Sequence, residues 1–280
     1  MFASEERFFE LVFAGVPPTR MTQIFPTSES YRSHLQYLAG VGVVRGPQAA
    51  GTGVLFATYF AVAKVVVDFV ALEARAIFNL RAANAFAERD VRVSTFSISE
   101  LLKSLGSLRG AITFVEADLL NFFYQLAIPQ WMERLVALQI GERREEYTAT
   151  VLPMGWDRSC RVAQAITVGG VGHRLVEEDT LGLPQEAAQE ALPPSLLELN
   201  WRGAWGLLAV IYDTIFVAVT NEELANLWEE RIRRNFAFLR LELKYLRKTR
   251  ATCFDGIEVR RGRPRRRRVT TIVRAHRNQS

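Results

Sequence analysis

The sequence predicts an α+β protein in which strands and helices alternate along the chain. Short runs rich in β-branched and aromatic residues, such as residues 210–219, are typical of strands. Between these runs lie segments with apolar residues at helical spacing and with recognisable helix ends. The chain has 280 residues, of which 49% are hydrophobic, so it can bury a core as one large domain or two modest ones.

Cysteine and histidine are too sparse for two common kinds of stabilising site. The two cysteines, Cys160 and Cys253, cannot build a disulfide framework. The three histidines are widely scattered and do not match the spacing of zinc ligands. We therefore expect a protein of a reducing, intracellular compartment, nuclear or cytoplasmic.

The positive charge is concentrated near the C-terminus. The chain carries a net charge of +5, and residues 259–268 alone hold more positive charge than that surplus. We expect residues 260–280 to form a basic, disordered tail. Such a run binds phosphate backbones or acts as a nuclear-import signal, and Arg265, Arg266, Arg267 and Arg268 are the candidate nucleic-acid contacts.

No membrane segment is expected. Acidic residues, Glu5 and Glu6, stand where a signal peptide carries basic ones. Residues 53–72 are the stretch that most resembles a membrane span, but Lys64 and Asp68 lie inside it. Charges at mid-bilayer are costly, so this stretch is better explained as buried strands.

The first half of the chain gives several element predictions. Residues 1–48 form an N-terminal extension with no assigned chemistry, and residues 53–56 and 64–69 are expected strands. Residues 97–106 are expected to form a short helix that is capped by a serine and ends at a glycine. A strand over residues 111–118 then ends in a carboxylate.

Further elements are predicted in the second half. A helix is expected from Ser159 to about Thr167, stopped by Gly169 and Gly170, and residues 174–200 form an acidic, proline-interrupted loop with a short helix. Asn221 caps a further helix, with glutamates in its first turn that complement the helix dipole. Its apolar stripe is predicted to be core and consists of Leu224, Leu227, Trp228, Ile232 and Phe236. Residues 239–244 and 253–259 are two more expected strands.

Two carboxylates interrupt or end apolar strands, Asp118 and Asp213. Burying an isolated ionised Asp costs several kcal/mol unless it is paired or holds a metal. Taken alone, each is most simply a strand-end or turn residue that faces water. Carboxylates from separate strands of one sheet are, however, what a two-metal phosphoryl-transfer site requires.

The sequence between these carboxylates resembles the reverse transcriptase family. Residues 118–126 match the family's first motif, in which a metal-binding Asp is followed five residues later by an aromatic steric gate against the ribose 2′-OH, here Phe123. Residues 152–164 match a Leu-Pro-x-Gly-x-x-x-Ser turn that opens a helix with a Gln and lies over the template and the incoming nucleotide. The resemblance implies nucleotide contacts from Met154, Gly155 and Gln164. The glycine would let the backbone approach the nucleic acid closely.

A fingers signature of the family, basic-x-x-x-Asp-x-Arg-x-Leu-Asn, resembles residues 75–84, with Asn79 in place of the Asp and Ala83 in place of the Leu. Residues 64–73 are a rival match that loses the Arg and the Asn. We favour residues 75–84 because their distance to the first motif is nearer that of the family. By resemblance, Arg75 and Lys64 would touch the triphosphate.

The third motif of the family, an aromatic-x-Asp-Asp hairpin, is altered in this chain. Residues 211–214 read Ile-Tyr-Asp-Thr, so the first Asp is present as Asp213, the second is Thr214, and the aromatic is displaced by one. Lys244 and residues 254–256 look like the lysine of the fourth motif and a changed Phe-Leu-Gly primer-grip turn. Together with Leu-Pro-Met-Gly-Trp, these changes suggest a retrotransposon of the tyrosine-recombinase (DIRS-like) kind.

The resemblance implies the palm of a right-hand polymerase, an antiparallel sheet backed by helices, with fingers and with the thumb absent or truncated. Residues 49–110 would be fingers-like, and residues 111–259 the palm with part of the fingers. The implied activity is RNA-directed DNA polymerisation, in which deoxynucleoside triphosphates extend a primer on an RNA or DNA template. Asp118 and Asp213 would hold Mg²⁺ or Mn²⁺, and Lys244 would assist the leaving group.

Two alternatives stay open. Thr214, Asn79 and Asp255 depart from the family pattern and favour a catalytically degenerate retroelement protein that keeps the fold and at most binds nucleic acid. Because Thr214 contributes no negative charge, we expect weak activity at best. An unrelated basic domain of mixed α and β structure is the minor alternative.

Overall fold

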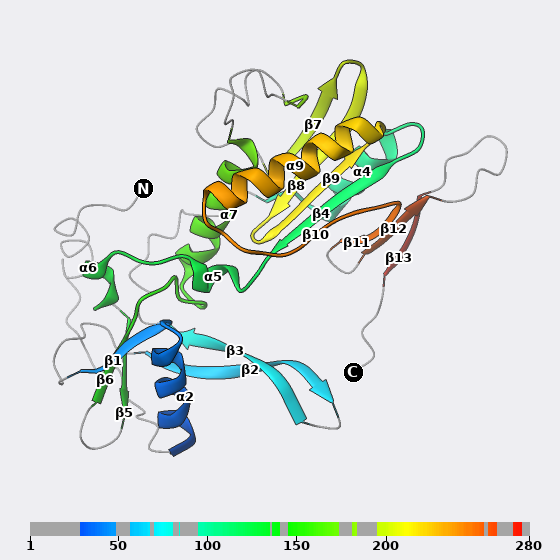
Figure 1. The fold of residues 1–280 in the computed structure, drawn as a ribbon. Helices are drawn as coiled ribbons and strands as arrows, with labels where there is room; N and C mark the ends of the chain where they lie inside the picture. The colour runs from blue at the N-terminus through cyan, green and yellow to red at the C-terminus, as the bar shows by residue number, and fades with distance from the viewer. Residues whose placement is uncertain are drawn as a thin grey trace. The chain divides into compact units, whose positions relative to one another are not determined.

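The computed structural model describes residues 29–48, 57–67, 70–80, 84, 95–134, 136–140, 145–173, 181–183, 195–254, 257–261 and 271–275. The chain divides into two compact units, and each is built from two separate stretches (Figure 1). One unit comprises Met1–Val91 and Phe123–Cys160, and the other comprises Arg92–Phe122 and Arg161–Ser280. The fingers and palm boundaries inferred from the sequence stay a prediction.

The first unit contains a three-stranded sheet, a hairpin and short helices. Its sheet has the antiparallel order β1 (Val44–Gln48), β6 (Glu145–Ala149), β5 (Ala137–Ile140). The hairpin pairs β2 (Thr58–Val67) with β3 (Val70–Asn79), and the helices are α2 (Glu29–Gly40) and α6 (Gln130–Glu133). A further short helix, α5 (Phe122–Gln125), begins at the boundary between the units. The expected strand at residues 64–69 overlaps β2, and the one at 53–56 lies outside the described residues.

The second unit is organised around a five-stranded antiparallel sheet. Its order is β10 (Leu243–Thr249), β4 (Thr113–Leu119), β9 (Thr214–Val219), β8 (Ala204–Ile211), β7 (Leu196–Trp201). The helices are α4 (Ile98–Ser107), α7 (Asp157–Gly172), whose first residues belong to the first unit, and α9 (Glu222–Phe238). A small antiparallel sheet follows, with β11 (Ala251–Phe254), β12 (Ile257–Arg261) and β13 (Thr271–Ala275). The α+β prediction, an antiparallel palm-like sheet backed by helices, is confirmed.

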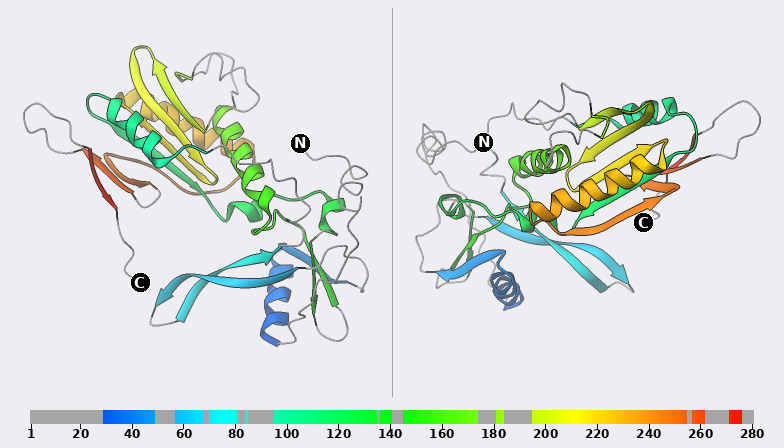
Figure 2. Two further views of the ribbon diagram at one scale, coloured as in Figure 1. Left: turned by 180° about the vertical axis from the view of Figure 1, so that it is seen from behind. Right: turned by 45° about the horizontal axis from the view of Figure 1, so that its top comes forward.

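Helices α9 and α4 cover opposite faces of this sheet, as the two opposed views show (Figures 1 and 2). Helix α9 packs on β4, β9 and β10. The Asn221 side chain caps it by accepting from the backbone N–H groups of Glu223 and Leu224, as the sequence predicts. The members of its apolar stripe that are fully buried are Leu224, Trp228, Ile232 and Phe236, whereas Leu227 is exposed. The stripe is therefore core, apart from Leu227.

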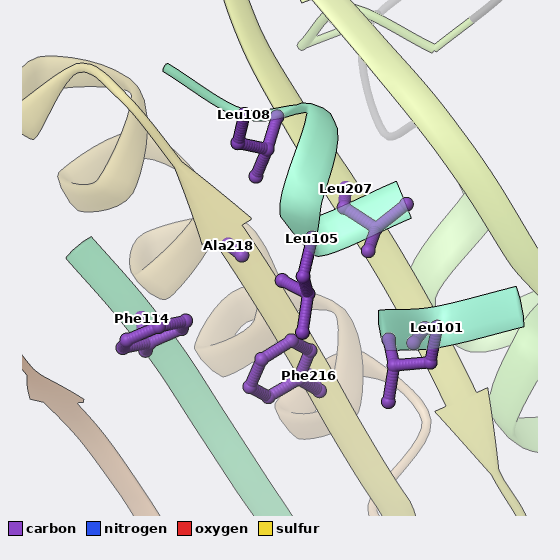
Figure 3. Close-up of a cluster of buried hydrophobic side chains, with 8 residues drawn as sticks. Leu101, Leu105, Leu108, Phe114, Leu207, Phe216 and Ala218 are labelled. Carbon is purple, nitrogen blue, oxygen red and sulfur yellow. The ribbon is translucent and has the colours of Figure 1, made fainter. Parts of the chain in front are cut away.

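The opposite face is covered by α4 at the end of β4 where Phe114 lies. Leu101, Leu105 and Leu108 pack there against Phe114 and Phe216 (Figure 3). The helix begins with a reciprocal capping box between Ser97 and Glu100, so the predicted capped helix is confirmed. Because strand side chains alternate between faces, this face continues along β4 from Phe114 to Glu116 and Asp118.

Helix α7 does not stop at Gly169 and Gly170, and that prediction is wrong. It continues to Gly172 because Gly170 allows close packing, since a Cβ there would lie 2.9 Å from Leu239 Cδ1 and 3.1 Å from Phe236 Cζ. The carbonyl groups at its end accept hydrogen bonds from the side chains of Arg231 and Asn235. Tertiary packing and these side-chain partners outweigh the local preference of the glycines.

Two other element predictions need correction. The segment expected as a loop contains the strand β7. The strand expected at residues 239–244 begins only at Leu243, because Arg240 adopts a left-handed φ of 56° and Leu241 donates its N–H to the Phe236 carbonyl, which turns the chain after α9. The single strand expected at residues 253–259 overlaps two strands, the end of β11 and the start of β12. Residues 255–256 between them lie outside the described residues. Among the helices that the structure describes, none has the length and hydrophobicity needed to cross a membrane.

Candidate functional site

Asp118 is the last residue but one of β4 and lies on the same face of the sheet as Phe114 and Glu116. Its direct strand partners are Tyr245 on β10 and Thr214 on β9. Directly opposed residues of an antiparallel pair project on the same face. The Asp118 carboxylate, 17% exposed, is therefore flanked by a phenol on one side and a hydroxyl on the other.

Asp213 occupies the two-residue turn between β8 and β9, whose last pair is Ile211 and Thr214. The backbone N–H of Leu119 donates to the Asp213 carbonyl over 3.0 Å, which ties this turn to the end of β4. The Thr214 hydroxyl donates to Asp213 Oδ1 over 3.4 Å. The structure thus brings Asp118 and Asp213 to adjoining strand ends of one sheet.

Gln164 of α7 holds the backbone of this turn on both sides. Its Nε2 donates to the Val210 carbonyl over 2.9 Å, and its Oε1 accepts from the Tyr212 N–H over 2.6 Å. Tyr212 has a left-handed φ of 49°, a conformation that a bulky residue rarely adopts. The sequence marks Gln164 as a nucleotide contact, but its buried amide is engaged with the turn, where it positions Asp213.

Lys244 reaches Asp118 from the edge strand of the sheet. Leu243 pairs with Leu119 and Tyr245 with Asp118, so β10 has one residue more than β4 in this interval, and that extra residue is Lys244. This is a β-bulge, a feature that redirects a side chain and bends the strand. The Lys244 Nζ lies 3.2 Å from Asp118 Oδ2.

Three residues of this face, Glu116, Tyr245 and Arg247, were not identified from the sequence. Glu116 is 4% exposed, and its Oε2 accepts from both Nε and Nη2 of Arg247 over 2.8 Å. In the described part of the chain its other oxygen, Oε1, is buried and has no hydrogen-bond partner. The available signal was the spacing, because residues two apart on a strand share a face and Glu116 stands two before Asp118.

Tyr245 is surrounded by charged side chains on the face of the sheet that carries Asp118. The Arg247 guanidinium lies 4.9 Å from the Tyr245 ring centroid. Burial raises the pKa of the Tyr245 phenol, and the negative charges of Asp118, Glu116 and Asp213 raise it further, against the opposing effect of Arg247. Burial also raises the pKa of Glu116, and the bonds from Arg247 oppose this rise. The three carboxylates Asp118, Glu116 and Asp213 therefore all act on the same phenol.

The side chains at these strand ends include two carboxylates, the ligand type that a hard divalent cation prefers. Mg²⁺ prefers charged oxygen ligands, which Asp118 and Asp213 supply. The neutral Thr214 stands where the resemblance would place a third carboxylate. Within the described ranges, no three or more Asp, Glu, His or Cys side chains gather as a metal-binding group.

In the first unit, the turn that contains Met154 and Gly155 packs against the end of β3. The Phe78 N–H donates to the Met154 carbonyl over 2.8 Å, and Asn84 Nδ2 donates to the Gly155 carbonyl over 2.9 Å. Gly155 has a φ of +110°, and a Cβ there would lie 2.0 Å from the Phe78 carbonyl oxygen. The structure therefore joins the two stretches that resemble the fingers signature and the Leu-Pro-x-Gly turn, and it gives Gly155 a packing role.

The remaining predicted residues also belong to the first unit or lie outside the described residues. Phe123 lies in α5 and is partly buried. Lys64 and Arg75 lie in β2 and β3, with side chains outside the description. The four arginines at 265–268 lie outside the described residues, and their nucleic-acid role stays a prediction.

Comparison with known proteins finds similarity in the fold alone. No family model matches the chain, and the curated proteins contain no match. Among solved structures, a foamy viral protease–reverse transcriptase in complex with double-stranded DNA is similar with a TM-score of 0.59 and 16% identity, over 88% of this chain and 36% of that one. The native prototype foamy virus protease–reverse transcriptase is similar with a TM-score of 0.56 and 15% identity, over 88% of this chain and 28% of that one.

The CSH mutant of the prototype foamy virus enzyme gives the same result, with a TM-score of 0.56 and 16% identity over 86% of this chain. The chain spans about a third or less of the length of these proteins. Similarity at this identity carries the fold and not the activity. The chain has a reverse-transcriptase-like fold.

Proposed function

We propose that this chain is a reverse-transcriptase-like nucleotidyltransferase core that extends a DNA primer on an RNA or DNA template. The observation that carries the proposal is the pair of carboxylates, Asp118 and Asp213, on adjoining strand ends of the palm-like sheet. The buried Gln164 amide, which holds the turn that carries Asp213, supports it. A retrotransposon origin, of the tyrosine-recombinase kind, belongs to the same proposal.

The chain's own residues have distinct parts in this reaction. Asp118 and Asp213 would hold Mg²⁺ or Mn²⁺, which activates the primer 3′-hydroxyl and neutralises charge on the transferred phosphoryl group. Phe123 would exclude a ribose 2′-OH by its bulk, and Lys244 would present positive charge to the departing pyrophosphate.

Other residues of the chain would supply further nucleotide contacts. Arg75 and Lys64 would contact the triphosphate, and the turn at Met154 and Gly155 would lie along the template. The fingers-like region would then span residues 49–110 and the palm residues 111–259.

A catalytically degenerate protein that keeps the fold and binds nucleic acid is the second candidate. Two observations favour it. Thr214 stands directly opposite Asp118, and the Lys244 ammonium already neutralises that carboxylate. Binding would rest on positive charge, including Arg265–Arg268, and one structural neighbour is a reverse transcriptase in complex with double-stranded DNA.

Primer extension on an RNA template, with Mg²⁺ or Mn²⁺, separates the two candidates. Under the first proposal Asp118→Asn abolishes extension and Thr214→Asp increases it. Glu198→Gln, which removes an exposed carboxylate from β7, serves as a matched control and leaves extension unchanged. Duplex binding without extension by the unaltered chain would support the degenerate protein instead.

A further inference from the structure

We infer that Lys244 is a built-in counter-ion that occupies the cation position at Asp118 in the free protein, so that a divalent metal binds there by displacing the ammonium group. This inference rests on the proposed function, because it concerns the regulation of the same site. It assigns Lys244 a role before catalysis that differs from charge stabilisation of the leaving group.

The backbone of β10 is irregular at Lys244. A regular strand would alternate Leu243, Lys244 and Tyr245 between faces. The bulge places Tyr245 directly opposite Asp118 and still leaves Lys244 within reach of the same carboxylate, with Nζ 3.2 Å from Oδ2. Two successive residues of β10, Lys244 and Tyr245, thus both have side chains beside Asp118. In a regular strand only one of two successive side chains would lie on that face.

The Lys244 ammonium also changes the net charge of the site. The two carboxylates of the site carry two negative charges, and the Lys244 ammonium removes one of them. Thr214, opposite Asp118, contributes none. The nearby Glu116 does not add to the negative charge available to a metal ion, because Arg247 binds its carboxylate through two nitrogens. The site of the free protein therefore resembles one that already holds a monovalent cation.

The Lys244 ammonium can leave the Asp118 carboxylate at little cost. The Lys244 side chain is 48% exposed, so the ammonium can move into water without a large desolvation change. A metal ion with two positive charges competes with it for Asp118 Oδ2 and repels it. Once displaced, the same ammonium is free to meet an incoming phosphate.

The test is Mn²⁺ binding by the protein alone, measured by electron paramagnetic resonance titration at low salt without nucleic acid. Lys244→Gln removes the ammonium that competes with the metal for Asp118, which predicts about fivefold tighter Mn²⁺ binding, the upper range for a half-exposed ion pair. Lys244→Arg keeps the charge and should leave the affinity close to that of the unaltered chain. Asp118→Asn combined with Lys244→Gln should abolish the gain.

Lys248→Gln is the matched control. Lys248 lies on the same strand and pairs with Glu222 over 2.8 Å, away from Asp118. It should change Mn²⁺ affinity by less than about twofold. Circular dichroism of each variant checks that the fold is kept.

The inference is overturned if Lys244→Gln leaves Mn²⁺ affinity unchanged, including the case in which neither protein binds Mn²⁺ measurably. It is also overturned if Lys248→Gln produces the same gain, because the effect would then be general. Failure of the proposed function is seen separately, in primer extension. If the chain extends no primer but Lys244→Gln still tightens Mn²⁺ binding, the counter-ion role of Lys244 is supported. The proposed polymerase activity is then wrong.

Discussion

The backbone N–H of Tyr212 donates to Gln164 Oε1 over 2.6 Å, and this bond supports a tyrosine in the left-handed region of φ. The same side chain also satisfies the Val210 carbonyl. The turn that carries Asp213 is thus held by one buried amide from α7.

Replacing Gln164 with Leu should destabilise the second unit by about 2 kcal/mol, because it leaves a buried donor and a buried acceptor without partners. Urea unfolding measures the loss, and amide hydrogen exchange at Tyr212 should accelerate. Gln36→Leu, at an exposed position of α2, is the control and should change stability by less than about 0.5 kcal/mol. If amide exchange at Tyr212 were as slow in the Gln164→Leu variant as in the unaltered chain, the role of Gln164 in holding this turn would be contradicted.

Gly155→Ala should destabilise the first unit by about 3 kcal/mol. The added Cβ would lie 2.0 Å from the Phe78 carbonyl oxygen, and the φ of +110° is strained for any L side chain. Gly106→Ala is a matched control, since that helical glycine of α4 has nothing within 4 Å of the added Cβ. The control should be stabilising by about 0.5–1 kcal/mol. Equal unfolding midpoints for the two variants would refute the packing role.

Arg247→Ala should destabilise the sheet by about 2 kcal/mol at pH 7, because it leaves the buried Glu116 carboxylate without its partner. The double substitution Glu116→Leu and Arg247→Met should recover most of the loss. Arg233→Ala, which removes exposed pairs with Glu229 and Glu230 on α9, is the control and should cost about 0.5 kcal/mol. Additive losses in the double variant would show that the two residues are not coupled.

The capping box of α4 predicts a pH-dependent contribution to stability. Hydrogen bonds from the backbone N–H and the side chain of Ser97 lower the pKa of Glu100 in the folded protein. A depressed carboxyl pKa stabilises the fold above the unfolded value, near pH 4, and the contribution is lost as pH falls through the folded pKa. Glu100→Gln should therefore have a lower urea midpoint than the unaltered chain at pH 7, with the difference vanishing by about pH 2.

Lys103→Gln is the control for this experiment. It removes an exposed charge from the same helix but takes no part in the cap. Its difference from the unaltered chain should stay constant between pH 5 and pH 2, because both proteins contain the Glu100 carboxylate and its hydrogen bonds to Ser97. A pH-independent effect of Glu100→Gln would rule out the cap as its cause.

Local sequence signals predicted the elements whose ends are set by neighbouring residues. Ser97 and Glu100 define the start of α4, and Asn221 defines the start of α9, because caps act within three residues. The hairpin around Asp213 was equally readable, since two apolar runs flank a short polar turn. The Thr113–Leu119 strand was also predictable from local sequence, because an apolar run there is followed by a carboxylate near its end.

Features that depend on distant partners were not readable from single segments. The continuation of α7 past Gly170 depends on Arg231 and Asn235, some sixty residues later. The pairing of Glu116 with Arg247 depends on which strand lies beside β4, and the role of Gln164 depends on which hairpin lies beside α7. The sequence predicted Asp118, Asp213 and Lys244 as separate site residues. The contact between the Lys244 ammonium and the Asp118 carboxylate is seen only in the folded structure.

The bulge at Lys244 also makes this one position unusually tolerant of a change in chain length. If Lys244 were deleted, Leu243 and Tyr245 would become neighbours, and regular alternation would keep their pairing with Leu119 and Asp118. Inserting a residue at the same point would instead turn Tyr245 and Arg247 toward α9 and expose Leu246 on the Asp118 face. A single-codon deletion here would thus remove one ammonium group and leave the pairing of Leu243 and Tyr245 intact, so the extra residue is not needed for that pairing.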